Sequence, residues 1–250
     1  MDTRARRTQR CGAVDLETVL EDRAIAVVFQ PILALAHGGV VGHEALVRGP
    51  TGSRLESPAA LFAEARAAGE YERLAILCIQ ETLRAFSANG SRGLLFLNMS
   101  PLLVQRPGFD PGRARRFLEG LALCPASVVI ELTEDFPAID MRHLRDSLLL
   151  YRSMGFRVAL DDLGEGFSSL RLWSELRPEF VKADKHFVHG IARDAVKRQF
   201  LRSIQQIARR CGSQVIAEGI EDSEDLMAVR RIGVAMGQGW LIGRPRATLT

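Results

Sequence analysis

Carboxylate and amide side chains follow short apolar runs at several places along this chain. The runs VVGH, LLFL, VVI, VAL and VIA are rich in β-branched residues or leucine, as buried strands are. The residues that follow them are, in order, Glu44, Asn98, Glu131, the pair Asp161 and Asp162, and Glu218. Bringing several carboxylates into one buried site costs several kcal/mol unless a cation neutralises them. The pattern therefore indicates a metal-dependent active site on a barrel or an open sheet.

Each of these residues alone is a weak signal. A single Asp or Glu after a strand most often caps a helix or lies in a loop as a solvated charge. The Asp161–Asp162 pair is placed to cap a following helix, and Glu218 to pair with an arginine. Caps do not explain oxygen ligands after so many strands, however. Lys182 after EFV and Gln238 after VAMG extend the set, so we favour one shared site.

The elements that must position these residues alternate along the sequence. A length of 250 residues suits a single (β/α)₈ barrel. Eight strand-like runs, mostly separated by helical patterns, span Val27–Ile32, Val40–Leu46, Leu94–Leu97, Val128–Leu132, Val158–Leu160, Phe180–Lys182, Val215–Ala217 and Val234–Met236. Residues 33–39 are too few for a crossover helix, so we expect the first strand to be antiparallel. The predicted fold is α/β, a modified TIM (β/α)₈ barrel with the first strand antiparallel and the chemistry at the carboxyl ends of the strands.

Two of the helical patterns are well defined. Residues 59–68 follow Ser57-Pro58, a cap residue and a proline at the first helical position, and they stop at Gly69. The second pattern is an apolar stripe at helical spacing that stops before Gly212. It consists of Val196, Phe200, Ile204, Ile207 and Ala208.

Composition and charge narrow the class of protein. The net charge of +3 indicates no nucleic-acid-binding face. Four of the first ten residues are arginines, with no apolar segment behind them as in a signal peptide, and no run reaches the roughly 20 apolar residues of a membrane span. We expect residues 1–16 to be a disordered basic tail and residues 17–250 a single barrel domain. The four cysteines lack C-x-x-C spacing, so we expect reduced core thiols in a cytoplasmic protein.

The order of the motifs along the chain resembles that of one known family. The motifs are Gln30-Pro31-Ile32, Glu44-Ala45-Leu46 with Arg48, Leu97-Asn98-Met99-Ser100, Glu131-Leu132-Thr133-Glu134, Asp161-Asp162-Leu163-Gly164, Lys182-Ala183-Asp184, Ala217-Glu218-Gly219-Ile220-Glu221 and Gly237-Gln238-Gly239. This set is similar to the EAL-domain family of cyclic di-GMP phosphodiesterases, from about residue 17 to about residue 246. A lone EAL tripeptide means nothing, whereas the ordered set is specific. The resemblance also implies a barrel whose first strand is reversed.

The resemblance implies a two-metal hydrolase that linearises cyclic di-GMP to 5′-pGpG. Two Mg²⁺ or Mn²⁺ ions, about 3.5–4 Å apart, suit hard oxygen ligands and need no Cys or His. It implies that one ion is held by Glu44, Asn98, Glu131 and Asp161, and the second by Asp161, Asp162 and Glu218. Lys182 would hold the attacking water and offset the charge that develops on the phosphate. Glu218 is also the candidate general base, and Glu44 joins these two as a catalytic residue.

The same resemblance implies further contacts and partners. It implies substrate contacts for Gln30, Leu46, Arg48, Asp184 and Gln238, and loop-stabilising roles for Glu134 and Glu221. Arg48 would fork onto a substrate phosphate. A homodimer would form through the loop and helix that follow Asp162. We expect no nucleic-acid polymer as a partner, no membrane span, and control by expression, by dimerisation or by a separate regulatory protein.

Two other functions stay open. One is a catalytically weak EAL module that acts as a cyclic di-GMP receptor or a protein-binding regulator, although every metal position of the family is kept. The other is an unrelated metal-dependent barrel hydrolase, which the Gln30-Pro31 and Gly237-Gln238-Gly239 matches disfavour. One segment departs from the family's DDFGTG and reads DDLGEG, with Leu163 and Glu165 as the changed residues. A further carboxylate at that place is expected to repel the acidic site and weaken metal binding modestly.

Overall fold

The computed structural model of the chain describes residues 14–106, 111–132, 140–163 and 169–249. These residues form two compact units. The smaller unit comprises the described residues of Met1–Ala26 and Val47–Cys78, and the larger unit those of Val27–Leu46 and Ile79–Thr250. The single domain expected over residues 17–250 stays a prediction.

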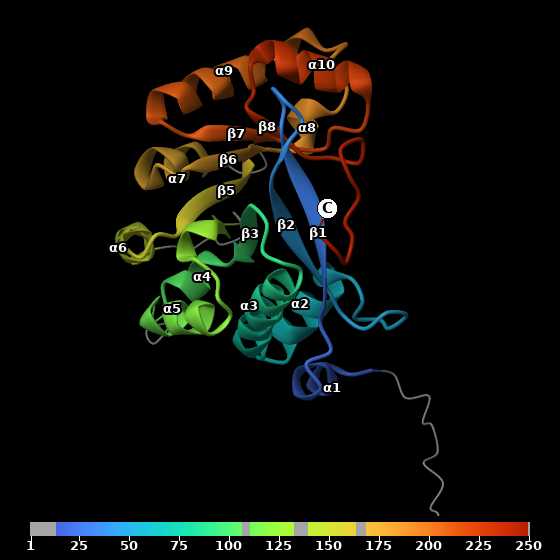
Figure 1. Ribbon diagram of the computed structural model, residues 1–250, viewed down its shortest axis with the longest axis vertical. Helices are drawn as coiled ribbons and strands as arrows, with labels where there is room; N and C mark the ends of the chain where they lie inside the picture. The colour runs from blue at the N-terminus through green and yellow to red at the C-terminus, as the bar shows by residue number, and fades with distance from the viewer. Residues whose placement is uncertain (1–13, 107–110, 133–139, 164–168, 250) are drawn as a thin grey trace, which may run out of the picture. The chain divides into compact units, whose positions relative to one another are not determined.

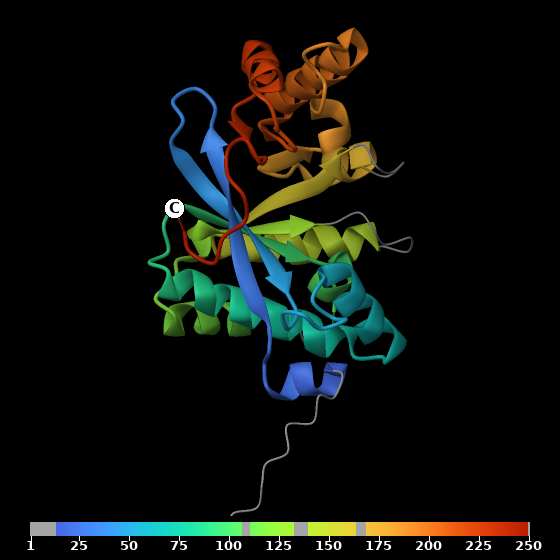
Figure 2. The same cartoon turned by 90° about the vertical axis from the view of Figure 1, so that its right-hand side faces the viewer.

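Eight strands close a barrel in sequence order from β1 to β8 (Figures 1 and 2). β1 (Ala26–Ala34) pairs antiparallel with β8 (Met236–Gly237), and the pairs from β2–β3 to β7–β8 are all parallel. The other strands are β2 (Val40–Arg48), β3 (Leu94–Met99), β4 (Val128–Leu132), β5 (Arg157–Leu163), β6 (Phe180–Ala183) and β7 (Gln214–Ala217). The predicted barrel with a reversed first strand is confirmed.

An apolar layer fills the interior of this barrel. Seven strands each contribute one buried side chain to it, namely Ile32, Phe96, Val129, Ala159, Phe180, Ile216 and Met236. The rings of Phe96 and Phe180 meet edge to face, with their centroids 5.3 Å apart. On β2 the matching position is Gly42, where a Cβ would lie 2.3 Å from the carbonyl oxygen of Leu94. Only glycine fits this close approach of β2 to β3.

The strands turn their alternate side chains toward the helices of the larger unit. Leu95, Ile130 and Val181 are buried in one cluster with Leu148 of α6 and Leu201 of α9. The helices after β3 are α4 (Pro101–Val104), α5 (Pro111–Gly120), α6 (Met141–Ser153), α7 (Ser169–Leu176), α8 (Lys185–Val188), α9 (Ala195–Cys211) and α10 (Ser223–Ile232), with a 3₁₀ turn, η1, at Pro125–Ser127. α3 (Tyr71–Ala88) begins in the smaller unit and ends in the larger one.

The apolar stripe predicted on α9 is divided between two faces of the helix. Ile204 and Ala208 are buried beside Leu201. The other three members of the stripe, Val196, Phe200 and Ile207, are 63%, 54% and 40% exposed. At about 3.6 residues per turn these three lie roughly a quarter turn from the buried face. The stripe therefore does not form one buried face, although the helix itself is present.

The smaller unit has an apolar cluster of its own. Asp15 accepts a hydrogen bond from the Thr18 amide and caps α1 (Leu16–Glu21). Ser57 caps α2 (Pro58–Ala67), with Pro58 at its start as the sequence predicts. The buried cluster consists of Leu16, Val19, Leu20, Leu55, Leu61, Ala65, Leu74, Leu77 and Cys78. Residue 16, the expected limit of the basic tail, is thus already helical, while residues 1–13 lie outside the described residues.

The cysteines differ in their surroundings. Cys78 is buried, as expected of a core thiol, whereas Cys124 and Cys211 are exposed. The expectation of core thiols was wrong for these two because both lie where an element begins or ends at the surface. Cys11 lies outside the described residues. Of the helices in the described part of the chain, none is long and apolar enough to cross a membrane.

The interior layer predicts a large stability effect for its aromatic residue on β3. Phe96→Ala should lower the free energy of unfolding by about 3–5 kcal/mol, because it removes a fully buried ring and leaves a cavity in the interior layer. Urea unfolding followed by circular dichroism measures the change. Leu149→Ala on α6 is the control; this side chain is 53% exposed and its loss should cost within about 0.5 kcal/mol. Equal losses in the two variants would contradict the interior position of Phe96.

Candidate active site

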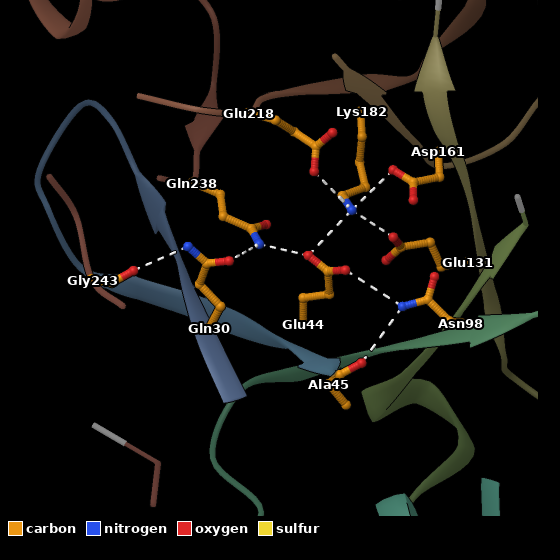
Figure 3. A network of polar contacts seen from close by, with 10 residues as sticks. All are labelled: Gln30, Glu44, Ala45, Asn98, Glu131, Asp161, Lys182, Glu218, Gln238 and Gly243. Carbon is orange, nitrogen blue, oxygen red and sulfur yellow. Dashed lines mark hydrogen bonds and ion pairs between the residues drawn. The ribbon is translucent and has the colours of Figure 1, made fainter. Parts of the chain in front are cut away.

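The candidate site is the next layer of the barrel interior, toward the carboxyl ends of the parallel strands. Side chains alternate between the two faces of a strand, so each site residue stands two positions from a member of the apolar layer or, on β2, from Gly42. Glu131 follows Val129 in this way, and on the reversed β1 Gln30 precedes Ile32. The layer comprises Gln30, Glu44, Asn98, Glu131, Asp161, Lys182, Glu218 and Gln238 (Figure 3). Asn98 and Asp161 lie inside β3 and β5, although the predicted strand runs ended just before these two residues.

Lys182 lies at the centre of this layer. Its side chain is 1% exposed, and its Nζ contacts four carboxylates from four other strands or strand ends (Figure 3). The distances from Nζ are 2.5 Å to Glu131, 2.8 Å to Glu218, 3.0 Å to Asp161 and 3.3 Å to Glu44. A buried ammonium is tolerated only with such partners. Lys182 thus holds the carboxylates together while they neutralise it.

Burial and charge shift the pKa values of these groups in different directions. Burial raises the pKa of Glu131 well above its usual value, and the charges of Asp161 and Glu44 add to the shift that Lys182 opposes. Burial also raises the pKa of Glu218, to about 8. Burial alone would lower the pKa of Lys182, but the surrounding carboxylates hold it well above its ordinary value. Lys182 is therefore charged, and Glu218 is a stronger base than an ordinary carboxylate.

An irregularity in β5 brings two consecutive carboxylates to one side. In a regular strand Asp161 and Asp162 would point to opposite faces. The pairing of β5 with β6 shifts register between Leu160 and Leu163, and Asp162 has a φ of 51°. Ligand oxygens of Asp161, Asp162 and Glu218 all lie within 4.8 Å of one another as a result. Bulges of this kind re-aim side chains near functional sites.

The donors present fit a hard divalent cation. One ammonium faces four carboxylates, which leaves an excess of acidic groups in a buried place. Glu131 is 0% exposed, and its Oε2 accepts no hydrogen bond from any described residue. Carboxylate oxygens are the ligands that Mg²⁺ and Mn²⁺ prefer. The oxygen triplet of Asp161, Asp162 and Glu218 offers such ligands beside the more buried Glu131 and Glu44.

Two glutamine amides support the acidic cluster from the side of β1 and β8. Gln238 donates from Nε2 to Glu44 Oε2 at 2.5 Å and to Gln30 Oε1 at 3.0 Å. Gln30 in turn donates from Nε2 to the Gly243 carbonyl at 3.1 Å. Asn98 Nδ2 lies 3.4 Å from Glu44 Oε1 (Figure 3). Its position after the run VAMG placed Gln238 in the predicted set, but nothing in the sequence pairs it with Glu44.

Three residues expected to contact substrate have other surroundings. Asp184 is buried and caps α8, with its Oδ1 accepting a hydrogen bond from the His186 amide at 2.7 Å. Leu46 is half-buried on β2. Arg48 belongs to the smaller unit, where its Nη1 donates to the Val47 carbonyl at 2.7 Å. The structure therefore gives Asp184 a local structural role and leaves the substrate contacts of all three as predictions.

The expected loop residues are described only in part. Glu221 is exposed in the segment between β7 and α10. Glu134 and Glu165 both lie outside the described residues. Leu163, the other departure from the family pattern, is 2% exposed in β5 and pairs with Ala183 of β6. Leucine at this position thus fits the apolar cluster that the strands form with the helices.

Comparisons of sequence place this chain beside known proteins. The model of the EAL domain matches residues 13–245. The chain is 32% identical over 234 residues to the probable cyclic di-GMP phosphodiesterase PdeB of Escherichia coli, a match that covers 92% of this chain and 44% of that protein. This chain therefore spans less than half the length of PdeB.

Comparisons of structure find the same barrel. The manganese/cy-diGMP complex of Klebsiella pneumoniae BlrP1 aligns with a TM-score of 0.81 at 28% identity, covering 89% of this chain and 56% of that one. The PaMucR phosphodiesterase in complex with c-di-GMP aligns with a TM-score of 0.81 at 26% identity, covering 93% of this chain and 96% of that one.

The raised pKa of Glu218 predicts how pH changes the stability of the metal-free protein. In the unfolded chain this carboxyl has its ordinary pKa of 4.5, and in the folded one about 8, so folding takes up a proton between these values. The stabilising contribution is complete below pH 4.5 and is lost as the pH rises through 8, by up to about 1.4 kcal/mol per pH unit for one proton. The Tm in EDTA should therefore fall between pH 6 and pH 9.

Glu218→Gln should reduce this fall, because its amide does not titrate, and Glu119→Gln on the surface of α5 should leave it unchanged. A Tm that stays constant or rises over this range in the unsubstituted protein would contradict the raised pKa.

Proposed function

Because this chain belongs to the EAL domain family, we propose that it is a metal-dependent phosphodiesterase that hydrolyses cyclic di-GMP to linear 5′-pGpG. The observation that carries the proposal is the meeting of Lys182 with four carboxylates inside the barrel. Charge that develops on phosphoryl oxygens needs fixed cations in a site of low dielectric constant. The name of PdeB and the bound nucleotide of PaMucR support the choice of substrate.

We propose that the site holds two Mg²⁺ or Mn²⁺ ions. Glu44, Asn98, Glu131 and Asp161 would hold one ion, and Asp161, Asp162 and Glu218 the other. Such a pair supplies an activated water and stabilises both the attacking and the leaving oxygen. The oxygen-only donor set and the manganese in the BlrP1 complex support this assignment.

The protein's own groups would then position and deprotonate the attacking water. Lys182 Nζ, held in place by its four carboxylates, would bind this water and a phosphate oxygen. A carboxylate oxygen of Glu218, whose Oε1 lies 2.8 Å from Lys182 Nζ, would accept the proton. Arg48 would fork onto a substrate phosphate. Gln30, Leu46, Asp184 and Gln238 complete the proposed substrate contacts, and Glu134 and Glu221 the loop supports.

A cyclic di-GMP receptor of low activity is the alternative that the experiment must separate. The departure at Leu163 gives no reason for lost activity, because this side chain is buried in the apolar cluster that the strands form with the helices. All the proposed metal positions carry oxygen ligands. Hydrolysis is therefore favoured over binding alone.

We further propose a homodimer formed through the loop and helix that follow Asp162. The exposed apolar side chain of Leu170, 59% accessible on α7, supports an interface there.

A cytoplasmic location is supported by the free thiols of Cys78, Cys124 and Cys211, because disulfides are rare in that compartment. A separate regulatory protein stays a prediction.

The proposed chemistry predicts a large loss of turnover in three variants. Glu44→Ala, Asp161→Ala and Lys182→Ala should each lower kcat at least about 10²–10³-fold, on the order of 3–4 kcal/mol of transition-state stabilisation. The assay is the release of 5′-pGpG with Mg²⁺ or Mn²⁺, identified by chromatography. Excess EDTA should abolish it, and Ca²⁺ should support little turnover because its coordination is longer and looser.

Glu119→Ala is the control, since this residue pairs with Arg115 on the surface of α5. Undiminished activity in EDTA would refute the two-metal mechanism. Near-normal rates in all three variants would place the chemistry elsewhere, and tight binding of cyclic di-GMP without 5′-pGpG would favour the receptor.

The proposed dimer predicts that specific activity falls on dilution. Leu170→Glu should shift the mass measured by light scattering from dimer to monomer and lower the activity of a concentrated sample, because it buries a charge in the interface. Met227→Glu on α10, where the side chain is 47% exposed, is the matched control. A monomeric mass with constant specific activity at every concentration would reject the dimer.

A further inference from the structure

We propose that the segment after β8, residues 239–246, positions Glu44 for metal binding through the side chains of Gln30 and Gln238. The inference rests on the proposed function in one respect, the assignment of Glu44 as a metal ligand. It gives the two glutamines a positioning role, which differs from the substrate contacts considered above. The contacts that carry it form one continuous chain of hydrogen bonds from Gly243 to Glu44 (Figure 3).

The segment is fixed to β1 at two points. Phe29 and Arg246 exchange backbone hydrogen bonds of 2.7 and 3.0 Å, as neighbours in an antiparallel sheet do. Gly243 lies against the ring of Pro31, where a Cβ would come within 2.5 Å of Cγ. Both views of the fold show this part of the chain, in red, running beside β1, in blue (Figures 1 and 2). The Gly243 carbonyl is therefore held at a defined place.

The direction of each hydrogen bond is set by the groups at the two ends of the chain. The Gly243 carbonyl can only accept, so Gln30 must turn its Nε2 toward it and its Oε1 toward Gln238. Gln238 must then present Nε2 to this oxygen. The same Nε2 reaches Glu44 Oε2, and a carboxylate also can only accept. Turning either amide over would set oxygen against oxygen, so the orientation of both amides is unique.

This chain restricts Glu44 before any cation arrives. Gln238 holds Oε2 at 2.5 Å, closer than Lys182 at 3.3 Å, and Asn98 lies 3.4 Å from Oε1. Without the Gln238 amide, the two longer contacts are the polar side-chain contacts that Glu44 keeps among the described residues. Groups that orient a ligand by hydrogen bonding commonly change metal affinity 10–100-fold. The geometry therefore gives Gln238 the largest effect, with Gln30 and Gly243 acting through it.

The test measures Mn²⁺ binding without substrate, by electron paramagnetic resonance of free Mn²⁺. Gln238→Leu should raise the Kd of the site at least about tenfold, and Gln30→Leu and Gly243→Ala by a few-fold each. Gln205→Leu is the matched control, because this amide on α9 is also buried, at 7% exposure, and lies outside the chain of contacts. Gly120→Ala controls for the glycine change, since its Cβ would meet no atom within 4 Å.

Steady-state kinetics separate positioning from substrate contact. Positioning raises the half-saturating Mn²⁺ concentration of Gln238→Leu and Gln30→Leu, whereas a substrate contact alone would raise KM for cyclic di-GMP at saturating Mn²⁺ and leave the Mn²⁺ dependence unchanged. A raised KM with an unchanged Mn²⁺ Kd in both variants would overturn the inference and leave the phosphodiesterase proposal intact. Altered Mn²⁺ affinity in a protein that hydrolyses no cyclic di-GMP would uphold the inference and refute the proposed reaction. If Gln238→Leu does not fold, an unchanged Kd in folded Gln30→Leu and Gly243→Ala overturns it.

Discussion

A strand presents a side chain to the interior of a barrel at every second residue, and that interval ties the packing of this protein to its chemistry. The apolar layer that contains Phe96 and Phe180 stands two residues from the layer of carboxylates, amides and one lysine. A shift of one residue in any strand would move both layers to the wrong face together. The stability of the barrel and the geometry of the site are therefore set by the same registers, and the reversed β1 obeys the rule with its direction inverted.

Charge balance is the second constraint, and Lys182 meets it from within the chain. Its ammonium gives the carboxylates a partner that is present in every molecule, whatever the metal concentration. Glu218, whose pKa burial raises to about 8, relieves part of the remaining excess by holding a proton in the metal-free protein at neutral pH. Metal binding and proton release are coupled at such a site.

Much of the fold and the membership of the site follow from local patterns in the sequence. Short connections predict the reversed β1, and apolar runs predict which residues belong to the site, as for Glu131. The register shift in β5 has no such signal, because the run VALDDL contains no glycine or proline to mark it. The exposed face of α9 and the cap that Asp184 makes depend on what packs nearby. The contact between Gln238 and Glu44 spans 194 residues, a distance over which residue spacing carries no information.

The hydrogen bonds that orient Glu44 also have a consequence for the timing of folding. Gln238 and Gly243 reach their partners across 194, 208 and 213 residues of chain, while β1 and β2 are neighbours joined by a short turn. Contacts of such long sequence separation form late, after the loops between them have closed. During synthesis Glu44 is among the first site residues to leave the ribosome, yet it acquires its amide partner only when β8 and the segment after it have emerged. A nascent barrel therefore has Glu44 long before it has the amide that orients this carboxylate.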